Sequence, residues 1–145
     1  MKKLILFLLF TLYSFAVTPY SLENLKEVNL KVLNKKNEIS EKLEKRLKKD
    51  IKVKLEKAGI KTKTEKYSNF LVKIKINKIK DINFVRTSIM ISEDVIPLRD
   101  KDVEALAITY KKDDSFESED LEKDIYESIV DYLLEDFLEQ YKDEN

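Results

Sequence analysis

The chain has 145 residues, with 28 Lys or Arg balanced by 28 Asp or Glu, and it contains one glycine and no His, Cys or Trp. The missing residue types exclude Ser-His-Asp and Cys-His catalysis, thiol redox chemistry and zinc sites built on imidazole or thiolate. A single glycine also excludes a glycine-rich phosphate loop and the dinucleotide fingerprint, so we expect no cofactor and a protein that is not an enzyme.

The N-terminal segment has the pattern of a secretory signal peptide. Lys2 and Lys3 precede an apolar stretch over residues 4–13, and Ser14-Phe15-Ala16 offers small residues three before and one before a cut. An uncleaved membrane anchor is the alternative, but residues 4–17 are shorter than the roughly 20 residues that a span needs. A lipid anchor is excluded because no cysteine is present.

We therefore expect residues 1–16 to be removed, and the mature protein to be periplasmic or secreted with no stable membrane span. Residues 17–24 form a short lead-in segment. Residues 25–145 are enough for a single domain with one hydrophobic core, which must hold by burial alone because no disulfide can form.

The domain begins with a predicted strand and an amphipathic helix. Val28, Leu30 and Val32 alternate with polar residues, which is the period of a half-buried strand. After a polar break, apolar residues recur every four positions and predict a helix; they are Ile39, Leu43, Leu47, Ile51 and Leu55. Ser40 or Asn37 can cap its start, and Gly59 suits the left-handed residue that follows a helix.

A second strand is predicted after a turn region at residues 61–69. Phe70, Val72, Ile74 and Ile76 share one side of it, and the strand runs to about residue 80. Residues 81–83 turn the chain into a further strand at 84–91.

A loop and a last strand are expected next. Residues 92–101 contain Pro97 and several acids, which favour a loop. A strand follows over about residues 103–111, with Leu106, Ile108 and Tyr110 on one side.

The chain ends with a long predicted helix. Residues 112–117 form a polar turn, and Ser118 is expected to cap the helix. Its apolar ladder consists of Leu121, Ile125, Ile129, Leu133, Phe137 and Tyr141. The element order β-α-β-β-β-α predicts an α+β two-layer sandwich with both helices on one face of a short sheet.

Charge is distributed unevenly along the chain. Residues 17–80 hold 19 Lys or Arg against 8 Asp or Glu, whereas residues 81–145 hold 7 against 20. In one interpretation, the basic first helix and the acidic closing helix lie side by side and neutralise each other. In the other, a basic surface binds an anionic envelope lipid or an acidic envelope protein; its candidate residues are Lys45, Lys49, Lys52, Lys73 and Lys75.

Other candidate sites are weaker. The acid-rich residues 113–120 lack the glycine and the regular spacing of a calcium-binding loop, so a solvated turn is expected there. Tyr67 and Tyr110 are interpreted as core or rim residues rather than ligand contacts. We predict no catalytic and no metal-ligating residue, and no nucleic acid as a partner.

In element order alone, the chain is similar to small envelope-assembly subunits such as the lipopolysaccharide-assembly lipoprotein and transporter-auxiliary lipoproteins, whose lipid-attachment cysteine it lacks. The signal peptide and the missing catalytic residue types predict an exported, periplasmic, non-enzymatic binding or assembly subunit of the bacterial cell envelope. Two alternatives are a carrier that holds a lipid or other apolar ligand between sheet and helices, and a small carboxylate-dependent hydrolase.

Overall fold

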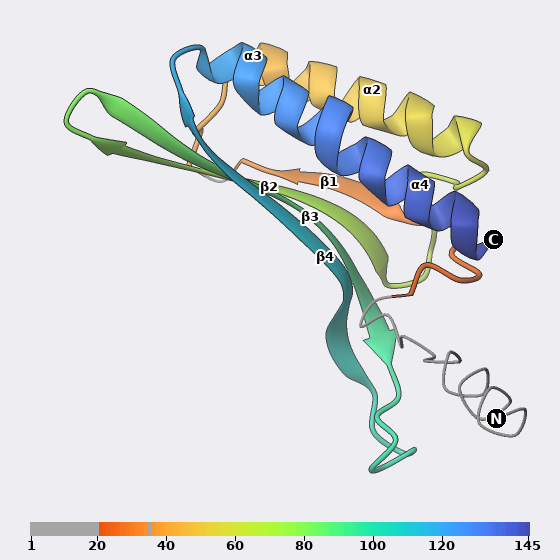
Figure 1. The fold of residues 1–145 in the computed structure, drawn as a ribbon. Coiled ribbons are helices and arrows are strands. Elements are labelled where there is room, and N and C mark those ends of the chain that lie inside the picture. Colours follow the sequence, from red (N-terminus) through yellow and green to blue (C-terminus); the bar gives the residue numbers. More distant parts are fainter. Residues whose placement is uncertain (1–20, 35) are drawn as a thin grey trace, which may run out of the picture.

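The computed structural model describes residues 21–34 and 36–145 (Figure 1). The predicted signal peptide and its cleavage after Ala16 lie outside these residues. The described elements follow the predicted order: β1 (Asn29–Leu33), α2 (Glu41–Lys57), β2 (Ser68–Ile79), β3 (Ile82–Val95), β4 (Ala105–Ser118), and a closing helix built from α3 (Leu121–Tyr126), the π-helical segment η1 (Glu127–Leu133) and α4 (Leu134–Glu144). The predicted α+β two-layer sandwich is confirmed, with the helices on one face of the sheet.

The four strands lie in the order β1-β2-β3-β4. β1 runs parallel to β2, whereas β2–β3 and β3–β4 are antiparallel. Phe70 lies opposite Ile91 and Val72 opposite Ile89, and all four side chains are buried. The alternation of apolar residues in β2 therefore selects the sheet face that the helices cover.

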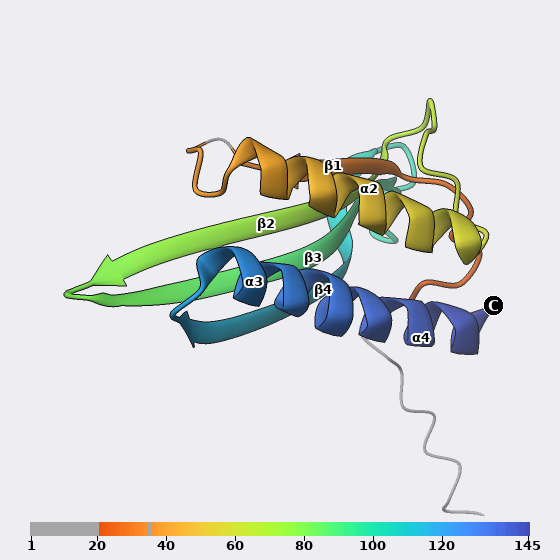
Figure 2. The same cartoon turned by 90° about the horizontal axis from the view of Figure 1, so that it is seen from above.

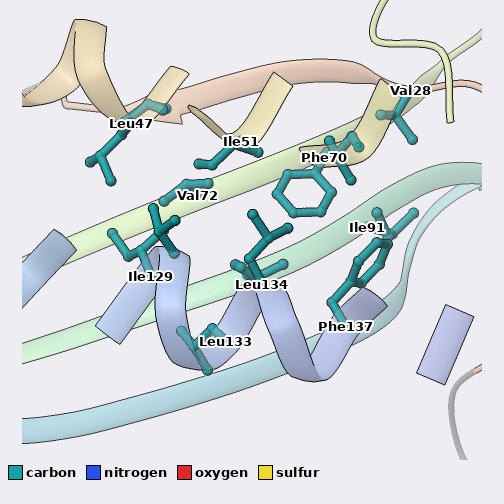
Figure 3. Packing of buried hydrophobic residues seen from close by; sticks show 14 of the residues in the cluster. Val28, Leu47, Ile51, Phe70, Val72, Ile91, Ile129, Leu133, Leu134 and Phe137 are labelled. Carbon is teal, nitrogen blue, oxygen red and sulfur yellow. The ribbon is translucent and has the colours of Figure 1, made fainter. Parts of the chain in front are cut away.

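The core fills the space between the sheet and the helix layer (Figure 3). The helix layer contributes four fully buried side chains to this core, which are Leu47 and Ile51 of α2 and Ile129 and Leu133 of η1. Leu22, which the sequence places in the lead-in segment, also belongs to this core. The packed domain therefore includes residues that precede the predicted start at residue 25.

The ends of α2 follow from local chemistry. The Ser40 hydroxyl accepts a hydrogen bond from the Leu43 backbone N–H (3.1 Å), which satisfies one of the unpaired donors of the first turn. Gly59 follows the helix with φ +93°, a conformation that an L side chain rarely adopts. Both expectations for this helix, the cap at Ser40 and the structural role of Gly59, are confirmed.

Strands β3 and β4 are longer than predicted, so the expected loop at residues 92–101 is wrong in part and the expected turn at 112–117 is wrong. β3 continues to Val95, and the polar end of β4 pairs with β3 as far as Ser118. Several polar side chains of this end have partners that satisfy them. Asp113 accepts from the Ser88 hydroxyl (2.5 Å) and pairs with Lys111 (2.9 Å).

A β-bulge in β4 reverses the side on which its residues lie. Ile91 is opposite Tyr110, but Ser92 is opposite Ile108, so Thr109 is an extra residue on β4. Tyr110 therefore faces the helices and is buried, whereas Leu106 and Ile108 lie on the open face of the sheet and are exposed. The expectation that Leu106, Ile108 and Tyr110 share one side is wrong, because simple alternation cannot reveal a bulge.

The closing helix also begins later than predicted. Asp120, not Ser118, is the N-cap, and its carboxylate accepts from the Lys123 N–H (3.2 Å). The Ser118 hydroxyl instead donates to Asp124 (2.8 Å). Further along, the π-helical segment η1 has a wider turn than an α-helix. A buried hydrogen-bond chain lies at its start: the Thr87 hydroxyl contacts the Ser128 hydroxyl (2.7 Å), and Ser128 donates to the Asp114 carboxylate (2.7 Å).

Candidate interaction surfaces

The end of the β3–β4 hairpin exposes large apolar side chains. In Figure 1 this connection projects from the sheet on the side away from the helices. Leu98 is 98% exposed, and the other members of the group are 42–60% exposed. We call this group the apolar hairpin, and its members are Ile96, Leu98, Val103, Leu106 and Ile108. Such a concentration of apolar side chains in water is typical of an interaction site.

Local geometry explains why these side chains point outward. The bulge at Thr109 turns Leu106 and Ile108 to the face that no helix covers. Pro97 lacks a backbone N–H and lies two residues after the end of β3, where pairing has stopped. The tip is shaped by a hydrogen bond from the Asp102 N–H to the Asp100 carboxylate (3.0 Å).

The apolar hairpin carries an excess of acidic charge. Its tip contains Asp100, Asp102 and Glu104 against Arg99 and Lys101. A surface of this kind combines apolar contact area with negative charge around it. The excess over residues 99–104 is one negative charge, three acids against two bases.

A second surface runs along β1 beside α2. Two hollows meet there, and both are lined by Leu30 and Lys48. We call the combined depression the basic groove; its basic residues are Lys31, Lys48, Lys52, Lys61 and Lys63, and its acidic ones are Glu44 and Glu56. Hydrogen bonds from Lys48 and Asn34 lower the pKa of Glu44, which stays ionised beside its lysine.

The structure does not bring the five predicted lysines into one surface. Lys52 lines the basic groove, and Lys45 and Lys49 are exposed on α2 but do not line it. Lys73 and Lys75 alternate with the buried Val72 and Ile74, so they point to the opposite face of the sheet. The expectation that these strand lysines extend the basic surface of the helix is therefore wrong.

The seam between α2 and the closing helix uses other charged residues. The Arg46 guanidinium lies over the Tyr126 ring at 3.8 Å from its centroid, and the Tyr126 hydroxyl donates to Asp50 (2.9 Å). Burial and the Asp50 carboxylate raise the pKa of Tyr126. Lys54 forms an ion pair with Glu135 across the seam. Mutual neutralisation of the helices is thus seen at Lys54, whereas Lys45 pairs with Glu41 within α2 (3.5 Å).

The two tyrosines that were considered as ligand contacts have different surroundings. Tyr110 is buried and its ring meets Phe137 edge-on at 5.1 Å, as expected for a core residue. Tyr67 is 49% exposed, with the Lys31 ammonium 5.9 Å from its ring centroid. Residues 113–118 belong to β4, so the expectation of a solvated turn there is wrong. Among the described residues, no group of three or more acidic side chains is placed to hold a metal ion.

Sequence reasoning missed the apolar hairpin. The signal was present as Val95, Ile96 and Leu98 within residues 92–101, which were expected to form a loop. Apolar residues that flank a proline in a polar loop have no core to enter, and this marks them as candidates for contact with a partner.

Neither models of known protein families nor the sequences of curated proteins match this chain. Within residues 21–34 and 36–145, no helix has the length and apolar character needed to cross a lipid bilayer.

Proposed function

We propose that this protein is exported to the periplasm and serves there as a non-enzymatic binding or assembly subunit of the cell envelope. The observation that supports this proposal most is the apolar hairpin, whose Leu98 side chain is almost fully exposed. Covering apolar surface is favourable by about 25 cal/mol per Å², so a complementary partner gains free energy by docking there. The signal-peptide pattern of residues 1–16 supports the location.

The partner that fits the hairpin is an envelope protein with an apolar depression and a basic rim. Asp100, Asp102 and Glu104 lie in the same segment as the apolar side chains and outnumber Arg99 and Lys101 by one charge, which disfavours contact with an anionic membrane. They favour lysine or arginine side chains at the edge of the partner site.

The carrier alternative has less support from the structure. The space between the sheet and the helices is occupied by packed side chains, among them Phe70, Leu134 and Phe137 (Figure 3). Phe70 and Phe137 meet edge-on at 5.1 Å, which leaves no room for a ligand between them.

Native gel electrophoresis of a periplasmic extract from the cells that make this protein tests the proposal. We expect the wild-type protein to migrate in a complex and to begin at Val17, as determined by N-terminal sequencing. The variant Ile96→Asp/Leu98→Asp should migrate as the free protein, because charge on the apolar surface opposes docking. Its melting temperature should be unchanged, because both side chains are exposed in the folded state.

Val53→Asp is the matched control, because Val53 is 56% exposed on α2, away from the hairpin. It should leave the complex intact. Migration of the wild-type protein as a free subunit would contradict the binding role, and a start at Met1 in the membrane fraction would contradict export.

A further inference from the structure

The first strand leaves one backbone edge of the sheet open. β1 is the outermost strand and pairs with β2 on one side only, since within the described residues no strand pairs with Asn29–Leu33 on the other. In the view from above, β1 lies at the margin of the sheet beside α2 (Figure 2). An edge strand presents unpaired N–H and C=O groups, onto which another extended chain can add.

The basic groove follows this open edge. It is lined by Leu30, Val32 and Leu33 of β1, by Lys48 and Lys52 of α2, and by the segment after Gly59. The depression therefore combines an open strand edge with the flank of a helix, which is the arrangement used by domains that bind peptides through strand addition.

The charge of the groove selects the chemistry of its ligand. Five lysines line it against two glutamates, and both glutamates already pair with a lysine of α2: Glu44 with Lys48 and Glu56 with Lys52 (3.8 Å). Lys61 and Lys63 form no ion pair with any residue in the described part of the chain. Their positive charges are available to carboxylates of a bound segment.

We infer that the basic groove binds an extended, acidic polypeptide segment of a partner protein, which adds as a further strand to the open edge of β1. β1 has five residues, and the chain just before it already pairs with Lys61 at Glu27, so the bound segment pairs along about five residues. Alternate side chains of the segment point toward α2, where the half-buried Leu30 and the aliphatic stems of Lys48 and Lys52 lie. This site is separate from the apolar hairpin and does not depend on it.

Fluorescence anisotropy with a labelled, end-capped heptapeptide of alternating Glu and Val tests this inference on the protein purified from cells. Saturable binding at 50 mM NaCl is expected, with at least tenfold weaker binding at 500 mM because the attraction is ionic. Two further peptides carry N-methyl groups on either the odd or the even residues. Strand addition places alternate N–H groups against β1, so one of these peptides should bind at least tenfold more weakly than the other.

The charge of the groove is tested by Lys52→Glu/Lys63→Glu, which should abolish binding. The matched control is Lys45→Glu/Lys49→Glu, which changes the same number of charges outside the groove and should retain binding within twofold. Melting curves of both variants should match that of the wild type, because the substituted lysines lie on the surface.

Three results would overturn the inference. Equal binding of the two N-methylated peptides would mean general ionic attraction without strand addition. Equal loss in both double variants would mean that no groove is used. Concentration-dependent self-association of the wild-type protein that Lys52→Glu/Lys63→Glu abolishes would identify a second copy of this chain, not a separate partner, as the occupant.

Discussion

Tyr110 and Phe137 join the last strand to the closing helix. Their rings meet edge-on at 5.1 Å, and Phe137 makes the same contact with Phe70 of β2. Burial, with the negative charges of Asp136 and Glu144, raises the pKa of Tyr110 to about 12. The folded state therefore favours the neutral phenol more strongly than the unfolded chain does.

This difference predicts a loss of stability at high pH. The contribution from Tyr110 is fully present below pH 10, the ordinary pKa of tyrosine, and is lost as the pH rises toward about 12. We measure the free energy of unfolding by urea at pH 8, 10 and 11. It should fall less steeply with rising pH in Tyr110→Phe than in the wild type. Parallel curves for the two proteins would contradict the assigned environment.

The buried face of the closing helix is predicted to contribute much of the stability. Leu133 has no exposed surface. Leu133→Ala should lower the free energy of unfolding by about 2–5 kcal/mol, because the substitution removes buried methyl groups and leaves a cavity. Val53→Ala shortens an exposed side chain of α2 and should change the free energy of unfolding by less than about 0.5 kcal/mol. Equal effects of both substitutions, measured by urea unfolding, would mean that the closing helix is peripheral.

The seam between the helices is held by a small number of contacts. The Lys54–Glu135 ion pair is partly exposed, so we expect a coupling energy of about 0.2–1 kcal/mol. A double-mutant cycle with Lys54→Gln and Glu135→Gln measures it by urea unfolding. Lys49→Gln is the control, because Lys49 is exposed and pairs with no carboxylate in the described part of the chain. A coupling energy of zero would mean that the seam depends on Tyr126 and apolar packing alone.

Periodicity predicts the elements whose side chains meet the core. α2 was predictable because Leu43 and Leu47 repeat at helical spacing, and β2 because Phe70 and Val72 repeat at strand spacing. All four side chains are buried. The polar end of β4 was not predictable. Asp113 and Asp114 are satisfied by Ser88, Lys111 and Ser128, and nothing in the sequence identifies these residues as their partners. A strand whose polar groups find partners across the sheet carries little apolar alternation.

The candidate surfaces were predictable only in part. The abundance of lysine in α2 indicated a basic surface, and Lys52 lies in the groove. Composition alone does not predict the surroundings of Lys45 and Lys49, because these depend on how α2 packs against β1 and the closing helix. Lys73 and Lys75 were separated from α2 because Val72 and Ile74 direct the opposite side of β2 into the core.

Across the whole molecule, the uneven charge of the sequence becomes a spatial polarity. The basic helix α2 lies over the sheet at its β1 edge, and the acidic closing helix lies over the opposite edge, at β4 (Figure 2). The basic groove and the apolar hairpin therefore occupy different ends of the strand order. The two proposed binding surfaces are therefore separated in the fold.

The most direct test of the proposed binding role is photo-crosslinking in intact cells with a photoreactive amino acid at position 98. Leu98 is the most exposed apolar side chain of the hairpin, and Val53 on α2 is the control position. We predict one discrete crosslinked species in the periplasmic or envelope fraction from position 98 and none from position 53. The absence of a discrete species from position 98, or the same species from both positions, would contradict the proposal that the apolar hairpin binds a partner.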